Sequence, residues 1–350
     1  MSLHPLLAGL KQSPDFFLQN LDLVNRRGLV VRLSEAGFRR ASFLDDRGLE
    51  PGTQGAWFPL APILERAAEL ATPPPPLAIF HVSHCGSTLL SRLLAELPGC
   101  LPLREPLTFL TLAMERRELG RPAARLDPEG WSKLFAACLK FLSRAYRPDE
   151  RVLIKATSAC TNLAKPFLSH DAGGRALFLY TQLEPWLATM LGSEANRENG
   201  RAYAPAWLMD FHALTGRDEP KLAELSDAEQ FTLNWLTGML TAERARAEFP
   251  YRVRTLDFDA FLQDTAGGLT ASGSFFGLDT SNAAVVAAGP LMQRYAKNPS
   301  QIFDAGTRKV KLEEARRTQA DELRAGLAFA EKLCRDIPAL KLLDGYFRRS

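Results

Sequence analysis

The chain has 350 residues, of which 46% are hydrophobic and 24% charged, and its formal net charge is +3. These values are ordinary for a globular protein, and no dense block of Lys and Arg predicts a nucleic-acid partner. The sequence has no apolar run long enough to span a membrane and no signal-peptide pattern at its N-terminus. Its five cysteines are widely spaced, which predicts neither a disulfide framework nor a zinc site. We expect a cytoplasmic protein that does not bind membranes.

A run of four prolines divides the predicted elements into two parts. Residues 1–71 are predicted to form a small N-terminal α+β module, with strands around a glycine turn in 28–45 and helices near 14–24 and 59–70. Residues 72–76 form a proline linker, since consecutive prolines favour an extended spacer. We recognise no chemistry in the module and expect it to contribute packing or to bind a partner.

Residues 77–350 are predicted to form one α/β domain, because strands and helices alternate along them as in βαβ units. Such units build a parallel sheet flanked by helices. We expect strands at 77–82, 101–103, 151–156, 175–181 and 252–257. We expect helices at 131–146, 185–191, 227–248 and 312–334. A capping box from Ser226 to Glu229 should begin the third of these helices.

The most informative segment is 77–94, which is predicted to be a buried strand, a turn at Gly86 and an amphipathic helix. The first N–H groups of a helix have no partner and carry partial positive charge, so this turn is a candidate phosphate site. Ser87 and Thr88 would add hydroxyl donors, and Gly86 would let the backbone approach the ligand. The ordinary ATP- or GTP-binding loop has a lysine where this chain has Ser87, which argues against such an enzyme. The alternative is that the turn merely caps the helix.

This segment resembles the phosphate loop of sulfotransferases, P-[KR]-S-G-[ST]-T-x-[LW]. The six residues on its first six positions are Ser83, His84, Cys85, Gly86, Ser87 and Thr88. The first three depart from the pattern and the last three match it. The resemblance implies a P-loop-type fold in which these residues hold the 5′-phosphate of 3′-phosphoadenosine 5′-phosphosulfate (PAPS), with the bisphosphate PAP as product and no metal. His84 is a conditional substitute for Lys or Arg, because histidine loses its charge near neutral pH.

Two further residues follow predicted strands at the edge where open α/β sheets gather ligand groups. Glu105 matches the position at which several sulfotransferases place the base that deprotonates the acceptor, and the alternative is a structural pair with Arg104. Lys155 begins a loose match to K-[ST]-[PA], and its ammonium group would stabilise the transferring sulfuryl group. The alternative for Lys155 is a lysine that extends to solvent at the sheet edge.

The segment expected to bind the 3′-phosphate departs from the family pattern, hhxRdPxxxxxS. Thr181 or Leu183 occupies the arginine position, depending on register, and neither offers the bidentate fork of a guanidinium. Ser193 is a candidate for the serine, and Arg197 or Arg201 is a candidate source of charge from the next loop. The donor is therefore either bound differently or is not PAPS.

The resemblance extends over about 77–295. Residues 251–278 resemble the late family segment of strand, acidic-aromatic turn and helix, and 294–297 falls where the family often has a basic loop over the nucleotide. A solvated turn is the alternative for 294–297. The resemblance implies an enzyme that transfers a sulfuryl group from PAPS to a hydroxyl or amine of a small-molecule or glycan acceptor. We expect residues 196–220 to shape the acceptor pocket.

Two other functions stay open. A non-catalytic member of the fold that binds a phosphorylated ligand or a protein is favoured by the missing arginine and disfavoured by the presence of Glu105 and Lys155. A P-loop kinase is disfavoured because only Asp257 is a candidate strand-end carboxylate for Mg²⁺. The sequence fixes neither the acceptor nor the oligomeric state.

Overall fold

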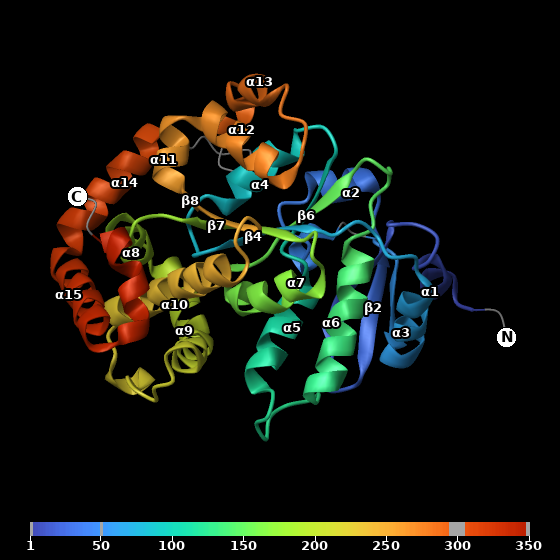
Figure 1. The fold of residues 1–350 in the computed structure, drawn as a ribbon, viewed down its shortest axis with the longest axis horizontal. Coiled ribbons are helices and arrows are strands. Elements are labelled where there is room, and N and C mark those ends of the chain that lie inside the picture. The colour runs from blue at the N-terminus through green and yellow to red at the C-terminus, as the bar shows by residue number, and fades with distance from the viewer. Residues whose placement is uncertain (1–2, 50–51, 294–304, 348–350) are drawn as a thin grey trace.

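A five-stranded parallel sheet forms the centre of the molecule (Figure 1). The computed structural model describes residues 3–49, 52–293 and 305–347. The strands lie in the order β5-β6-β4-β7-β8, and each neighbouring pair is parallel. Their bounds are β4 Leu77–His81, β5 Cys100–Arg104, β6 Arg151–Lys155, β7 Arg175–Tyr180 and β8 Val253–Asp257. All five strands predicted from the sequence are present, and β4 lies in the middle.

Both faces of this sheet are buried, which explains why its strands are continuous apolar runs. In β4, Leu77 and Ile79 belong to one hydrophobic cluster, whereas Ala78 and Phe80 belong to the other. Figure 1 shows α4 and α12 above the sheet and α5, α6 and α7 below it. The helices of the first side are α4 Ser87–Ala95, α8 Leu183–Leu191 and α12 Thr265–Phe276, and those of the second are α5 Leu107–Glu118, α6 Pro128–Leu142 and α7 Ala164–His170. The predicted α/β class with a parallel sheet flanked by helices is confirmed.

The N-terminal module holds a three-stranded antiparallel sheet in the order β1-β2-β3. Its elements are α1 Pro5–Gly9, β1 Phe16–Asp22, β2 Arg27–Arg32, α2 Glu35–Arg40, η1 Asp46–Gly48, β3 Gly55–Pro59 and α3 Leu60–Glu69. Phe17 and Val30 of this sheet belong to the same hydrophobic cluster as Phe80 of β4 and Phe109 of α5. The module therefore shares the core on the second side of the main sheet.

Two expectations for the module are wrong. The segment 14–24, predicted as a helix, is strand β1, because it pairs with β2 across a turn in which Arg26 has a φ of 50°. The second half of 28–45, predicted to contain strands, forms α2. Ser34 begins that helix by accepting a hydrogen bond from the Gly37 N–H at 3.2 Å.

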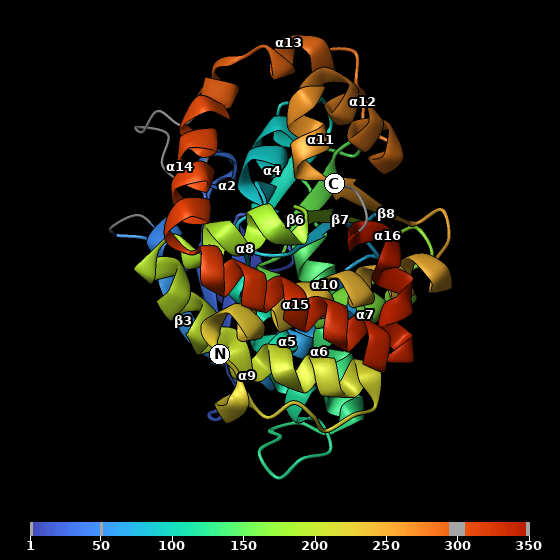
Figure 2. The same ribbon diagram turned by 90° about the vertical axis from the view of Figure 1, so that its left-hand side faces the viewer.

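The C-terminal half adds helices around α8 and α10. Figure 2 shows α14 beside α8 and α15 across α10. The bounds are η2 Ser158–Leu163, α9 Glu194–Thr215, η3 Leu222–Glu224, α10 Asp227–Glu248, α11 Phe258–Gln263, α13 Ala283–Ala287, η4 Pro290–Gln293, α14 Ala305–Thr318, α15 Ala320–Asp336, η5 Pro338–Leu343 and α16 Asp344–Phe347. The single helix predicted for 312–334 is two helices, divided at Gln319. The capping box of α10 is confirmed, since the Ser226 N–H donates to the Glu229 carboxylate at 2.9 Å.

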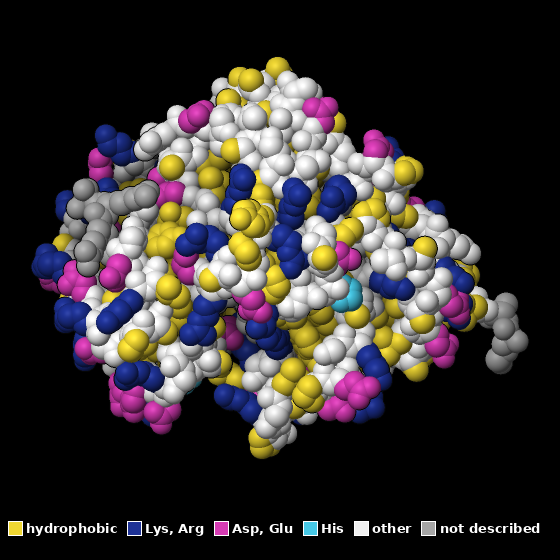
Figure 3. Space-filling model, viewed as in Figure 1, with side chains coloured by type: hydrophobic (Ala, Val, Ile, Leu, Met, Phe, Trp, Pro, Cys, Tyr) yellow, Lys and Arg dark blue, Asp and Glu magenta, His cyan; other side chains and the backbone are white. Residues whose placement is uncertain are grey.

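The surface carries charges of both signs. On the face shown in Figure 3, basic and acidic side chains are scattered among polar and apolar ones. Within the described ranges, no helix combines the length and the apolar character needed to cross a membrane.

Candidate functional site

The loop between β4 and α4 places the first N–H groups of α4 at the carboxyl edge of the sheet. Gly86 is the N-cap of α4 and has a φ of 78°, in the left-handed region that favours glycine. A Cβ atom at this position would lie 2.1 Å from the ring of Phe258. From the sequence we expected glycine at this position because it lets a ligand approach the backbone. The structure adds two further reasons for glycine, its left-handed backbone conformation and its packing against Phe258.

The six predicted loop residues differ in where their side chains lie. Ser83 and Cys85 are buried: the Ser83 hydroxyl lies 3.7 Å from the Met190 sulfur, and the Cys85 sulfur lies 2.7 Å from the Val82 carbonyl oxygen. His84 is partly exposed and has a φ of 55°. The loop therefore offers phosphate mainly its backbone N–H groups and the residues that follow Cys85.

Thr88 has a buried hydroxyl at the start of α4. Thr88 is 3% exposed, and its hydroxyl oxygen has no hydrogen-bond partner among the described residues. A buried polar atom without a partner costs about 1–3 kcal/mol. An unpaired hydroxyl beside the unpaired N–H groups of a helix is an arrangement that fits an oxyanion.

Glu105 and Lys155 form an ion pair at the ends of two neighbouring strands. Arg104, the last residue of β5, pairs with Lys155 in the sheet, and the Glu105 N–H donates to the Lys155 carbonyl oxygen at 2.7 Å. The Lys155 side chain is 1% exposed and that of Glu105 is 19% exposed. The lysine is thus buried, and it does not extend to solvent as the alternative reading required.

The backbone at Glu105 is strained. Its φ is 57°, which is uncommon for a residue with a side chain and typical of functional positions. With this backbone conformation the chain turns sharply between β5 and α5, and there the Glu105 carboxylate contacts Lys155.

Arg104 does not pair with Glu105, contrary to the structural alternative. Its guanidinium is buried and donates to the carbonyl oxygens of Arg39 and Ala41, at 3.1 and 2.8 Å, and to the Ser91 hydroxyl at 3.2 Å. Burial and, to a smaller extent, the neighbouring charge of Arg92 together lower the pKa of Arg104 to about 10. Arg104 therefore fastens the N-terminal module to the strand that precedes Glu105.

Sequence reasoning missed the side chains that surround this pair. The ring of Phe43 lies 5.9 Å from the Lys155 ammonium nitrogen and 4.1 Å from the Arg47 guanidinium carbon. Tyr203 of α9 is half-buried, and its pKa is raised by burial and by the charges of Cys160 and Glu105. Phe43 and Arg47 belong to the N-terminal module, in which we recognised no chemistry. No local sequence motif around them predicts their contact with each other or that of Phe43 with Lys155. Tyr203 lies within 196–220, the segment that we expected to shape the acceptor pocket.

The expected second phosphate position contains no arginine. Leu183 begins α8 and is buried, and Thr181 is buried with a hydroxyl that has no hydrogen-bond partner among the described residues. Ser193 is the N-cap residue of α9 and is exposed, without a side-chain capping bond. The structure thus places Ser193 after the end of α8, and Thr181 directly after β7.

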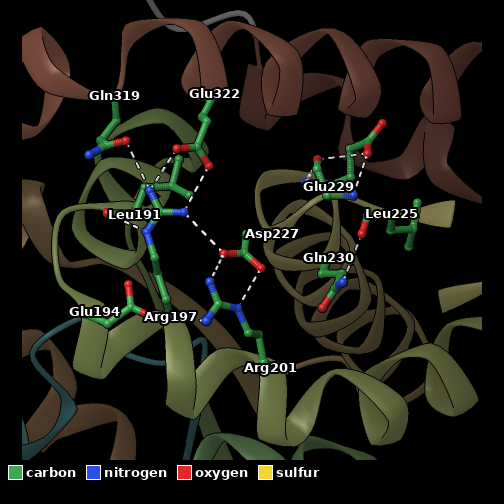
Figure 4. Close-up of polar contacts among 11 residues, drawn as sticks. Leu191, Glu194, Arg197, Arg201, Leu225, Asp227, Glu229, Gln230, Gln319 and Glu322 are labelled. Carbon is green, nitrogen blue, oxygen red and sulfur yellow. Dashed lines mark hydrogen bonds and ion pairs between the residues drawn. The ribbon is translucent and has the colours of Figure 1, made fainter. Parts of the chain in front are cut away.

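The charges of Arg197 and Arg201 are used between helices, as Figure 4 shows. Arg197 donates to Glu322 at 2.8 Å and to Asp227 at 3.2 Å, and Arg201 donates to Asp227 at 2.6 Å. These bonds join α9 to α10 and α15, and the Arg201 hydrogen bond lowers the pKa of Asp227. The idea that either guanidinium supplies charge to a phosphate is therefore not supported by their contacts.

Two arginines of α14 lie beside the β4–α4 loop and the β7–α8 loop instead. Arg308 pairs with Asp259, and its guanidinium carbon lies 5.9 Å from the centre of the Phe258 ring that packs on Gly86. Arg316 pairs with Glu184, in the first turn of α8, at 2.7 Å. The basic turn expected at 294–297 lies outside the described residues.

Asp257, the candidate carboxylate for Mg²⁺, is the last residue of β8. In the part of the chain that the structure describes, no group of three or more His, Cys, Asp or Glu side chains could hold a metal ion. Asp257 accepts a hydrogen bond from Gln182 at 2.8 Å and another from the Asp259 N–H at 2.9 Å. Asp257 thus acts as a helix cap for α11.

Comparison with solved structures returns sulfotransferases. The sulfotransferase domain from the curacin biosynthetic pathway matches with a TM-score of 0.45 and 12% identity, over 75% of this chain and 98% of that one. A sulfotransferase from Alicyclobacillus acidocaldarius matches with a TM-score of 0.37 and 14% identity, over 78% and 100%. A mouse sulfotransferase complexed with PAP matches with a TM-score of 0.40 and 12% identity, over 84% and 97%. No family model and no curated protein matches the sequence.

Proposed function

We propose that this protein is a sulfotransferase that transfers a sulfuryl group from PAPS to a hydroxyl or amine acceptor. The observation that carries the proposal is the Glu105–Lys155 ion pair, which lies at the same edge of the sheet as the β4–α4 loop. β6, which ends in Lys155, is the direct neighbour of β4. A base and a buried cation are therefore held close to a site that fits a phosphate.

The two side chains have complementary roles in an in-line transfer. Glu105 accepts the proton of the acceptor hydroxyl while the acceptor oxygen forms a bond to sulfur. The bond between sulfur and the bridging oxygen of the donor breaks, and PAP leaves with the electron pair. Lys155 neutralises the charge that develops on that bridging oxygen. Its ammonium group has three N–H donors, so it can bond Glu105 and the donor together.

The loop residues fit the 5′-phosphate end of the donor. The N–H groups that open α4 and the unpaired hydroxyl of Thr88 would bind the phosphate oxygens. His84 and Gly86 complete the loop at its partly exposed side, and Ser87 is buried at the start of α4. Ser83 and Cys85, whose side chains are buried, would act through the backbone.

The residues available for the 3′-phosphate of PAPS differ in type from those of the β4–α4 loop proposed for the 5′-phosphate. Thr181 offers a second unpaired hydroxyl, and Arg308 and Arg316 of α14 lie next to the two loops, each bonded to a carboxylate. We propose that these residues, rather than Ser193 or an arginine after β7, face the 3′-phosphate. The acceptor class stays part of the proposal and is developed in the next subsection.

Calorimetric titration of the protein with PAP, ATP and ADP tests the donor. We expect PAP to bind more tightly than ATP or ADP, because its two phosphate groups engage both loops. Tight binding of ATP without binding of PAP would contradict a PAPS-dependent enzyme. Failure to bind any of the three nucleotides would favour the non-catalytic alternative, in which the fold binds another ligand or a protein.

A further inference from the structure

The segment 42–47 of the N-terminal module lies directly beside the Glu105–Lys155 pair. The Leu44 N–H donates to the Arg104 carbonyl oxygen at 2.7 Å, one residue before Glu105. The Ser42 hydroxyl accepts a hydrogen bond from Arg92 of α4 at 2.7 Å. With the bonds from Arg104 to the backbone of Arg39 and Ala41, these contacts fix the segment on the sheet edge. The segment is therefore a fixed wall of the candidate site.

Phe43 and Arg47 are the side chains that this wall presents. Both the Lys155 ammonium and the Arg47 guanidinium lie within reach of a cation–π interaction with the Phe43 ring. Lys155 is almost completely buried, whereas the Arg47 side chain is 65% exposed. Arg47 is thus the accessible one of the two cations near the Phe43 ring.

The donors of Arg47 are only partly used. Its Nε and Nη2 atoms donate to the Asp45 carboxylate, with Nε at 3.0 and 2.9 Å from the two oxygens. Its Nη1 atom donates no hydrogen bond to a described residue. The pKa of Arg47 is raised, mainly by its hydrogen bond to Asp45 and to a smaller extent by the charge of Glu105. A planar guanidinium beside an aromatic ring, with Nη1 still unbonded to the described residues, is well suited to a carboxylate or phosphate.

A second donor-only group lies on α9. Tyr203 stacks on Trp207 of α9 with 6.3 Å between ring centroids. Trp207 is 4% exposed, and its indole N–H has no partner among the described residues. An indole N–H and a guanidinium can only donate hydrogen bonds, so both favour a ligand with acceptor oxygens.

We propose that Arg47, carried by the N-terminal module, determines acceptor specificity by binding an anionic group of an acceptor whose hydroxyl reaches Glu105. This inference rests on the proposed sulfuryl transfer and adds the class of acceptor: a hydroxyl compound that also carries a carboxylate or phosphate. It also gives the module a role in the reaction, as the part of the chain that selects the acceptor. The acceptor lies between the segment 42–47 and α9.

The test uses two probe compounds of nearly equal shape, 4-hydroxybenzoate and the neutral 4-hydroxybenzamide, together with their 3-hydroxy isomers. Binding of each to the PAP-loaded protein is measured by NMR titration, and the titrations are repeated without PAP. We expect at least one carboxylate to bind about tenfold or more tightly than its amide, which corresponds to about 1.4 kcal/mol. Arg47→Gln should reduce this preference to about onefold.

Arg27 provides a matched control in the same module. Its guanidinium also donates to an aspartate, Asp22, and lies 4.8 Å from an aromatic ring, that of Trp57, but it has no contact with the candidate site. Arg27→Gln should keep the carboxylate preference. Equal binding of acid and amide, absence of binding of both, or a preference that survives Arg47→Gln would overturn the inference. The PAP titration of the wild-type protein judges the sulfotransferase proposal separately.

Discussion

The two halves of the sheet's carboxyl edge use their charges differently. On the β5–β6 side, Lys155 and Glu105 meet at the strand ends, and Arg47 lies next to them on an aromatic ring. On the β7–α8 side, a buried leucine begins the helix, and Arg197 and Arg201 are bonded to carboxylates of other helices. In the first half the charged groups pair at the strand ends, whereas in the second half Arg197 and Arg201 join helices to one another. We infer that the acceptor side of this site is better defined than the donor side.

Removal of the buried cation should have the largest effect. Lys155→Met keeps the length and apolar packing of the side chain but removes its charge, so we expect about a thousandfold loss of turnover. Turnover is measured as single-turnover conversion of PAPS to PAP with the hydroxybenzoate probes as acceptors. Lys140→Met is the control, because Lys140 bonds two backbone carbonyl oxygens of the N-terminal module, at 2.9 and 3.1 Å. Equal losses in both variants would remove Lys155 from the reaction.

Glu105→Gln should reduce turnover on the order of a hundredfold, since the amide cannot accept the acceptor proton. It also leaves Lys155 as a buried charge without its carboxylate, which costs about 3–5 kcal/mol of unfolding free energy. Chemical denaturation measures that cost.

The double variant Glu105→Gln with Lys155→Met separates the two effects. It should recover most of the stability and none of the activity, because the uncompensated charge is gone. Recovery of turnover in the double variant would show that the pair has a purely structural role.

Thr88→Val removes the unpaired hydroxyl of the β4–α4 loop without changing its shape. We expect PAP affinity to fall about tenfold and unfolding free energy to rise by about 1 kcal/mol, because a buried oxygen without a partner is lost. Calorimetry and thermal unfolding measure the two changes. Thr181→Val removes the matching hydroxyl on the β7 side and should weaken PAP binding less. A larger loss at Thr181 than at Thr88 would contradict this order of the two hydroxyl groups.

Arg197→Gln should have the smallest effect on the ligand, with PAP affinity unchanged within about twofold, because its donors are bonded to Glu322 and Asp227. It should lower the unfolding free energy by about 1 kcal/mol, since the pairs are partly exposed.

The Asp227 network also predicts how stability depends on pH. Because the pKa of Asp227 is lowered in the folded state, its contribution is present above the unfolded pKa of about 3.9 and is lost as the pH falls through the folded value. The free energies of unfolding of Arg197→Gln and of the wild type should therefore converge as the pH falls below the folded pKa of Asp227. A large loss of PAP affinity in Arg197→Gln would instead return this guanidinium to the donor site.

The sequence was sufficient for the features that depend on local pattern. The five strands of the main sheet are apolar runs between turn residues, and the β4–α4 loop follows from a strand, a glycine and a helix in succession. Glu105 follows such a strand and Lys155 ends one, and the resemblance to sulfotransferases implied their roles. β1 was missed, because its apolar residues are not strictly alternating and its partner lies across a turn.

Contacts between distant segments could not be predicted. Arg197 bonds Glu322, 125 residues away, and nothing near Arg197 indicates that partner. Phe43 likewise reaches Lys155 only because the N-terminal module folds against the end of β5. The candidate role of Arg47 therefore depended on tertiary structure, whereas the roles of Glu105 and Lys155 did not.

The bonds from Arg104 to the backbone of Arg39 and Ala41 have a practical consequence for anyone who wishes to shorten this protein. The proline run at 73–76 looks like a natural place to cut. A protein that started there would leave a buried guanidinium without its carbonyl partners and would uncover the apolar side chains that face the module. We expect such a fragment to aggregate on expression, and deletions that aim to preserve the domain should leave the first 49 residues in place.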